Sequence, residues 1–332
     1  MSISRRHVLV GGAVAVPVAG VAGIGLVARG VLPGQSHWQR IIGDCDTGSS
    51  PPAAASGPSL TGTFPSAARR TDVRYTIWYP PGSEVGSALP VCVALHGRSG
   101  DHTFADSYAA APRFLAAEVA AGPTAPFALV GVDGGDAVNW HRRSDGDDPV
   151  VMISDELLPT LAAKGLRTGT DDRIGVWGWS LGGFGALHLA AVWGPKRVAA
   201  SVATSPAIWR TFDDAQPGTF DDRADFDRCD LFRRADSLVG VAVRIDCGLA
   251  DPFAEASAQF RSLVDPAPEG AHAKGCHDSP FAWSVAREEV RFLGSKLEPE
   301  PEPAPAPAHA PAQAPAQAPA TAPGGTAAPV GN

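Results

Sequence analysis

The segment GVWGWSLGGFGALHLA, residues 175–190, places one serine, Ser180, between an apolar run and a helix-like pattern. A strand is predicted to end at Trp177 and a helix to begin by Phe184, so the serine falls in the short turn between them. Gly178 and Gly182 complete the pattern G-x-S-x-G, in which small residues let a strand and a helix approach closely around a strained turn. This context predicts an α/β fold that presents Ser180 as a nucleophile; the alternative is a tight turn with an idle serine.

A serine hydroxyl is a weak nucleophile unless a base lies within hydrogen-bond reach and a carboxylate orients that base. Downstream, Asp251 lies in the loop after a predicted strand, and Asp246, nearer the strand end, is the alternative acid. His277 directly precedes the last predicted helix and is the favoured base, whereas His272, in the turn-like segment PEGAHAKG, is its competitor. The expected catalytic residues are therefore Ser180, Asp251 and His277.

Two backbone amides are expected to bind the oxyanion that develops during attack on an ester. The amide of Leu181 stands at the start of the helix after Ser180, where the helix dipole is positive. The amide of Arg98 follows the segment LPVCVALHG, residues 89–97, in a loop that supplies the second donor in such sheets. His96 in this segment is expected to shape the site rather than to act as the base.

Two further histidines have weaker expectations. His141, in the segment VNWHRRSD, is a candidate to line the pocket, and His188 is expected to be a packed helix residue. No His or Cys cluster has the spacing of a metal site, and the proposed chemistry requires no organic cofactor, so neither a metal nor a cofactor is expected.

The chain has five cysteines, an odd number, so at least one is expected to be free or bonded to another molecule. Cys92 lies inside a strand-like apolar run and is expected to be a free core thiol. Cys247 and Cys276 both fall beside the proposed catalytic loops, and we expect these two to pair.

Short apolar runs alternate with longer amphipathic ones along the middle of the chain. The predicted strands span residues 73–80, 89–97, 127–135, 173–178, 198–207 and 241–248, and the predicted helices span residues 111–122, 152–165, 184–194 and 279–297. The second helix is expected to begin at Ser154. This succession predicts a three-layer α/β sandwich around a mostly parallel sheet, with chemistry gathered at the carboxyl ends of the strands.

The two ends of the chain differ from its middle. Residues 1–30 place Arg5 and Arg6 before a long uncharged run and resemble a twin-arginine export signal, with a membrane anchor as the alternative. Residues 31–62 are rich in Ser, Pro and Gly and are predicted to be a linker to a folded domain at residues 63–297. Residues 298–332 alternate Pro and Ala and predict an extended tail. These features predict an exported protein, in the cell envelope or secreted.

Charge and composition exclude one class of partner. The 332 residues carry a formal net charge of −8, and 44% of them are hydrophobic, enough for a sizeable core. Without a basic excess, nucleic acid is not an expected partner. The expected partner is a small-molecule or lipid ester, with association with the cell envelope through the amino end.

Residues 63–297 resemble the esterase D-like branch of the α/β-hydrolases, a group that includes the trehalose mycolyltransferases. The resemblance rests on six motifs in the family's order: LHG, VDGGDAVNWH, DELLP, GWSLGGFGAL, GLADPF and CHDSPFAW. It implies a three-layer α/β-hydrolase sandwich. It also implies a triad at Ser180, Asp251 and His277 and oxyanion amides at Arg98 and Leu181.

The chain departs from the trehalose mycolyltransferases at two points. Those enzymes carry Asp-Gly-Leu-Arg where this sequence has His-Gly-Arg-Ser, residues 96–99, and they use a glutamate where this sequence has Asp251. The resemblance therefore implies a general serine esterase that works through an acyl-enzyme. Transfer of an acyl or mycolyl group to a sugar hydroxyl is the alternative, and a non-catalytic binding module on a hydrolase scaffold is a further one.

Overall fold

A computed structural model describes residues 45–122, 124–135, 140–169 and 172–297, together with Gly324, Gly325 and Gly331. The chain divides into two units, Met1–Glu298 and Pro299–Asn332. The export signal expected at residues 1–30 and nearly all of the tail expected at residues 298–332 lie outside the described residues. No helix among the described residues is both long and apolar enough to cross a membrane.

One eight-stranded sheet organises the first unit, with the strands in the order β1-β2-β4-β3-β5-β6-β7-β8. Its strands are β1 (Ser59–Ser66), β2 (Thr71–Trp78), β3 (Val91–Leu95), β4 (Ala128–Val132), β5 (Ile174–Trp179), β6 (Val198–Thr204), β7 (Ala242–Gly248) and β8 (His272–Ala273). The pairs β1·β2 and β2·β4 are antiparallel and all others are parallel. The predicted mostly parallel sheet is confirmed.

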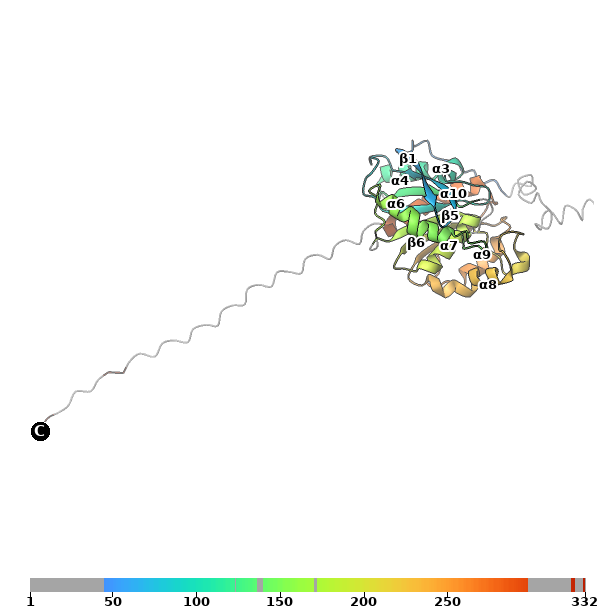
Figure 1. Ribbon diagram of the computed structural model, residues 1–332. Coiled ribbons are helices and arrows are strands. Elements are labelled where there is room, and N and C mark those ends of the chain that lie inside the picture. Colours follow the sequence, from blue (N-terminus) through green and yellow to red (C-terminus); the bar gives the residue numbers. More distant parts are fainter. Residues whose placement is uncertain are drawn as a thin grey trace, which may run out of the picture. The chain divides into compact units, whose positions relative to one another are not determined.

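Helices cover both faces of this sheet. Leu181, Phe184 and Leu187 belong to one apolar cluster, while Phe114 and Phe281 belong to a second cluster on the opposite face. The helical segments are α3 (Phe104–Ser107), α4 (Ala111–Ala121), α5 (Pro149–Val151), the π-helix η1 (Met152–Leu157), α6 (Leu158–Ala162), α7 (Leu181–Trp193), the 3-10 turns η2 (Phe212–Asp214) and η3 (Phe232–Leu238), α8 (Arg223–Cys229), α9 (Ala254–Arg261) and α10 (Ser279–Leu297). Figure 1 shows the yellow and orange α8 and α9 at the lower right of the domain. The result is the predicted three-layer sandwich.

The central strands are continuous apolar runs because both faces of a parallel sheet are buried. Every residue of β3, β4, β5 and β6 is buried, and so are the first eleven residues of α7. The turn between β5 and α7 is therefore held on both sides by buried structure. This rigid support fixes the position of Ser180.

Local boundaries differ from the sequence expectations at several places. The first strand, β1, starts at Ser59, four residues before the expected boundary of the folded domain, and pairs along its full length with β2. The helical segment expected from Met152 starts at Pro149, since Asp148 rather than Ser154 caps it by accepting from the amides of Val150 and Val151. Strand β5 also continues to Trp179, and the next helix begins directly after the serine.

The disulfide differs from the expected one. Cys276 is bonded to Cys45, so the expected Cys247–Cys276 pair is wrong. The position of both cysteines beside the catalytic loops does not bring them together; instead the segment before β1 lies against the domain, where the hydroxyl of Thr47 donates to the carbonyl of Pro280 over 3.0 Å. Cys92 is a free buried thiol, as expected. Cys229 and Cys247 are also free and buried.

Candidate active site

Ser180 occupies a strained turn between β5 and α7. Its φ of 56° and ψ of −117° place a non-glycine residue in a backbone region that costs free energy, a recurrent feature of functional sites. The turn requires glycine on both sides: a Cβ at Gly178 would lie 2.1 Å from the carbonyl oxygen of Gly182, and one at Gly182 would lie 1.9 Å from that of Leu95. The G-x-S-x-G pattern is thus a steric requirement of this turn.

Three side chains from distant parts of the chain form one hydrogen-bonded series. Nε2 of His277 lies 3.0 Å from Oγ of Ser180, and Nδ1 of His277 lies 2.8 Å from Oδ2 of Asp251. The Asp251 side chain is fully buried, while His277 retains 22% of its side-chain exposure. The histidine ring also contacts the rings of Trp179 and Phe253, with centroids 4.8 and 5.5 Å away. The structure therefore brings the three expected residues together.

The alternative acid and base lie elsewhere. Asp246 is buried in an ion pair with Arg244, at 2.7 Å, and also accepts from the amide of Ala271. Burial raises the pKa of Asp246 although Arg244 opposes that shift. His272 stands on the short edge strand β8 outside the pocket beside Ser180, and burial lowers its pKa.

The loop after β3 packs directly against Ser180. A Cβ at Gly97 would lie 3.2 Å from Cβ of Ser180, so the backbone leading to Arg98 borders the serine. Leu181 is the first residue of α7, where helical amides have no intrahelical acceptor. Arg98 and Leu181 both line the same pocket as Ser180. The two backbone amides expected to bind an oxyanion therefore flank the serine.

His96 stabilises that loop through hydrogen bonds to the backbone. Its Nε2 accepts a 2.8 Å hydrogen bond from the amide of Gly134, so the ring proton lies on Nδ1, which donates to the carbonyl of Gly97 over 2.7 Å. The indole of Trp140 donates to the carbonyl of His96 at 3.0 Å. Burial lowers the pKa of His96 and favours the neutral ring that these bonds require.

An open cavity of about 1540 Å³ lies in front of the serine. Aromatic side chains that sequence reasoning did not single out form much of its wall: Tyr108, Trp179, Trp209 and Phe253. Charged and polar groups at Asp101, Asp214 and Gln216 also line it. Trp209 and Phe253 lie in loops after strand ends, Trp179 ends β5 and Tyr108 follows α3, and none of these positions indicates the direction of the side chain.

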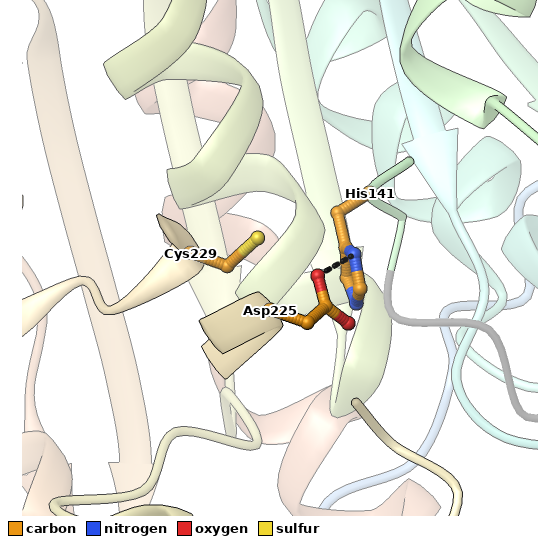
Figure 2. Close-up of side chains that lie close together, drawn as sticks. All are labelled: His141, Asp225 and Cys229. Carbon is orange, nitrogen blue, oxygen red and sulfur yellow. Dashed lines mark ion pairs between the residues drawn. The ribbon is translucent and has the colours of Figure 1, made fainter. Parts of the chain in front are cut away.

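His141 does not line this cavity, contrary to the expectation. It is 1% exposed and stacks on Phe220 with ring centroids 5.3 Å apart. Together with Asp225 and Cys229 it forms the one group of three buried metal-ligating side chains found among the described residues (Figure 2). His188, by contrast, is a packed residue of α7 as expected.

The sequence matches the Esterase family model, whose description is "Putative esterase", over residues 66–273. This match covers more than half of the chain and spans the strands that carry Ser180 and Asp251. His277 lies just beyond its end. No curated protein matches the chain in sequence.

Solved structures of several esterases are similar in fold. A ferulic acid esterase has a TM-score of 0.61 at 19% identity, over 73% of this chain and 99% of that one. An S-formylglutathione hydrolase from Agrobacterium tumefaciens has a TM-score of 0.58 at 17% identity, over 75% of this chain and 98% of that one. An enterobactin esterase from Shigella flexneri has a TM-score of 0.56 at 20% identity, over 75% of this chain and 61% of that one. At these identities the similarity establishes the fold.

Proposed function

The chain belongs to the Esterase family, in the esterase D-like branch of the α/β-hydrolases, and is a carboxylic ester hydrolase; we propose that Ser180, His277 and Asp251 carry out its chemistry. The single observation that supports this assignment is the unbroken hydrogen-bonded series from Oγ of Ser180 through both ring nitrogens of His277 to Asp251. A nucleophile, a base and an orienting carboxylate are the three roles that acyl transfer through serine requires.

Acylation begins when Oγ of Ser180 attacks the carbonyl carbon of the ester and its proton passes to Nε2 of His277. The new C–O bond moves the carbonyl π electrons onto oxygen and gives a tetrahedral intermediate. The imidazolium then donates its proton to the alkoxide as the second C–O bond breaks. Asp251 accepts from Nδ1–H throughout, which keeps Nε2 free to accept a proton and stabilises the charged ring.

The negative oxygen of the intermediate is bound by the amides of Arg98 and Leu181. Such preorganised donors stabilise the transition state because they need no reorganisation when the charge develops, and each contributes about 3 to 4 kcal/mol. Water activated by His277 then attacks the acyl-serine and releases the acid. The open cavity in front of Ser180 gives that water access.

We infer that the preferred esters carry an apolar or aromatic acyl group. Trp179 and Phe253 both contact the ring of His277, and Tyr108 and Trp209 also line the cavity. Aromatic rings gain offset-stacking or edge-to-face contacts beyond the area they bury. The ferulic acid esterase of similar fold bears the name of an aromatic acid, in agreement with this proposal.

We further propose that the chain works outside the cytoplasm. The paired arginines Arg5 and Arg6 ahead of an uncharged run support export, and so does the Cys45–Cys276 disulfide, because disulfides persist in oxidising compartments. Fractionation of cells that express the full chain tests this. We expect activity in the extracytoplasmic fraction, and we expect replacement of both arginines by lysine to retain it inside; unchanged export would contradict the twin-arginine assignment.

Acyl transfer to a hydroxylated acceptor is a second candidate because the cavity is wide and also lined by Asp101, Asp214 and Gln216. These polar side chains can hydrogen-bond to the hydroxyl groups of a sugar or glycerol. Product analysis with and without added trehalose or glycerol separates the two activities. New esters would establish transfer, and free acid alone would establish hydrolysis.

The central experiment combines chromogenic esters with a fluorophosphonate probe, which labels activated serines. We expect Ser180→Ala to abolish labelling and to lower kcat/KM by about 10³-fold or more. Ser107→Ala is the matched control, since this exposed serine lines the same cavity and its hydroxyl hydrogen-bonds to Thr103, far from the Ser180–His277–Asp251 series in the chain. A Ser180→Ala variant as active as its parent would refute the proposed nucleophile.

A further inference from the structure

A buried group of three metal-ligating side chains lies outside the catalytic cavity. Figure 2 shows the sulfur of Cys229 and the carboxylate of Asp225, both from α8, turned toward the imidazole of His141 from the segment after β4. One ligand atom of each residue lies within 4.8 Å of the other two, and all three residues are buried. None of them is needed for ester hydrolysis at Ser180.

The separation of the imidazole and the carboxylate suits a shared metal better than a direct hydrogen bond. Nδ1 of His141 and Oδ1 of Asp225 lie 3.4 Å apart, longer than the usual 2.7–3.2 Å of a hydrogen bond. Both ring nitrogens also face backbone carbonyls, Nδ1 that of Arg142 at 3.1 Å and Nε2 that of Thr219 at 3.4 Å. With the ring proton on Nε2 and directed at Thr219, Nδ1 is the nitrogen available to a metal. Two ligands on a tetrahedral zinc ion, each with a bond of about 2.0–2.2 Å, are separated by roughly this distance. Cys229 follows Asp225 by one helical turn, so both side chains leave α8 on the same face.

The surroundings can accommodate a bound cation. Zinc with one carboxylate and one thiolate is electrically neutral, which removes the cost of an uncompensated charge in a buried site. Oδ1 of Asp225 also accepts from Arg228, whose side chain is 61% exposed and can turn to solvent, while Oδ2 accepts from the amide of Asp221. Asp225 therefore stays held by backbone while Oδ1 binds a metal.

A second buried imidazole lies next to the cluster. The rings of His188 and His141 meet edge to face with centroids 6.4 Å apart. His188 is 5% exposed, and its Nδ1 has no hydrogen-bond partner in the part of the chain that the structure describes. A buried imidazole nitrogen without a hydrogen-bond partner costs free energy in an apolar interior. Its place beside His141, Asp225 and Cys229 is consistent with a region that binds a ligand.

We propose that His141, Asp225 and Cys229 supply three ligands to a divalent transition metal, with Zn²⁺ as the best fit and with water in the fourth position. Mixed sulfur, nitrogen and oxygen ligands suit this class of ion and disfavour calcium or magnesium. The metal would fasten α8 to the segment that follows β4. That segment also carries Trp140, whose indole holds the loop beside the catalytic serine through His96.

The test refolds the full-length oxidised chain, purified without a histidine tag, in the presence of Zn²⁺, of Co²⁺ or of no metal. We expect a stoichiometric amount of zinc by elemental mass spectrometry and a melting temperature several degrees higher with zinc than without it. With cobalt we expect the near-ultraviolet charge-transfer band of a thiolate ligand. Cys229→Ser and Asp225→Asn should remove the band and the stabilisation.

Cys247→Ser is the matched control, since Cys247 is also a buried free thiol but belongs to β7. It should keep the cobalt band. A band that survives Cys229→Ser or disappears in Cys247→Ser would overturn the ligand assignment. If the variants fail to fold, the parent protein alone tests the proposal. A parent that binds neither zinc nor cobalt refutes the site, and so does a parent that binds cobalt without a thiolate charge-transfer band.

Discussion

Nδ1 of His277 lies 2.8 Å from Oδ2 of Asp251, whereas the other carboxylate at the end of β7, Asp246, is committed to Arg244. The two aspartates are only five positions apart in sequence, yet Asp251 faces His277 and Asp246 forms a buried ion pair. Their replacement should therefore have opposite consequences for activity and stability.

Asp251→Asn should lower kcat by up to about 10⁴-fold with little effect on stability, because an amide at this position no longer stabilises the correct tautomer and charge of His277. Asp246→Asn should instead lower the free energy of unfolding by about 3 kcal/mol, because it leaves the buried guanidinium of Arg244 uncompensated. Steady-state kinetics and urea unfolding of both variants measure the difference. A folded Asp246→Asn enzyme with the kinetic defect of Asp251→Asn would reverse the assignment.

The Cys45–Cys276 disulfide should support both stability and catalysis because Cys276 is adjacent to His277. Cys45→Ser is expected to lower the free energy of unfolding by about 2–5 kcal/mol and to reduce kcat by loosening the loop that carries the base. Thermal unfolding and ester hydrolysis, each with and without a reductant, provide the measurement. The reductant should impair the parent and leave Cys45→Ser unaffected; equal sensitivity of both would show that another thiol is responsible.

Glu289 should make stability depend on pH. The carboxyl group is fully buried, where it bonds to Trp177 and Thr204, and burial together with the nearby Asp246 raises its pKa from 4.5 to about 8, opposed by Arg244. Between these pH values the folded chain holds a proton that the unfolded chain has released. The contribution of Glu289 to the free energy of unfolding should thus be greatest below pH 4.5. It should fall as the pH rises toward 8, by at most about 1.4 kcal/mol per pH unit.

Glu289→Gln tests that dependence, since glutamine keeps the shape and can bond to the same two partners. Urea unfolding at several pH values between 5 and 8 should give a steeper decline for the parent than for the variant. Titrating groups that do not interact with Glu289 contribute equally to both proteins, so the difference reports residue 289 together with its interaction with Asp246. Parallel curves would mean that the carboxyl does not change its protonation on unfolding in this range.

His96 should act as a positioning residue for the oxyanion loop. His96→Ala removes the bonds to Gly97 and Gly134, and we expect kcat to fall by about 10- to 100-fold, less than the roughly 10²- to 10³-fold loss of an oxyanion donor itself. KM should change little because the cavity walls stay in place. His96→Asn, which can restore a donor toward Gly97, should recover part of kcat. A loss confined to thermal stability would indicate a purely structural role.

Much of this site could be predicted from the sequence because its parts are locally encoded. The glycines around Ser180 are needed for a turn that a strand and a helix close within a few residues. The order of strands and helices then predicts which loops reach the carboxyl edge of the sheet. The sequence favours Asp251 and His277 in this way, because each lies in such a loop downstream of the serine, and it leaves Asp246 and His272 as alternatives.

Sequence alone could not decide contacts that depend on how distant segments pack. The expected partner of Cys276 was Cys247, and its actual partner, Cys45, lies in a segment whose composition resembles a linker. The choice between Asp251 and Asp246 likewise depended on which direction each side chain faces at the end of β7.

By itself, then, the sequence determined the α/β architecture, the strained turn at Ser180 and the order of the residues behind it, because periodicity, glycine content and loop position act over short stretches of chain. Only the tertiary structure decided the disulfide, the acid that faces His277, and the meeting of His141 with Asp225 and Cys229. No local pattern links His141 to α8; they meet because the sheet order and the apolar packing around α7 bring their segments together.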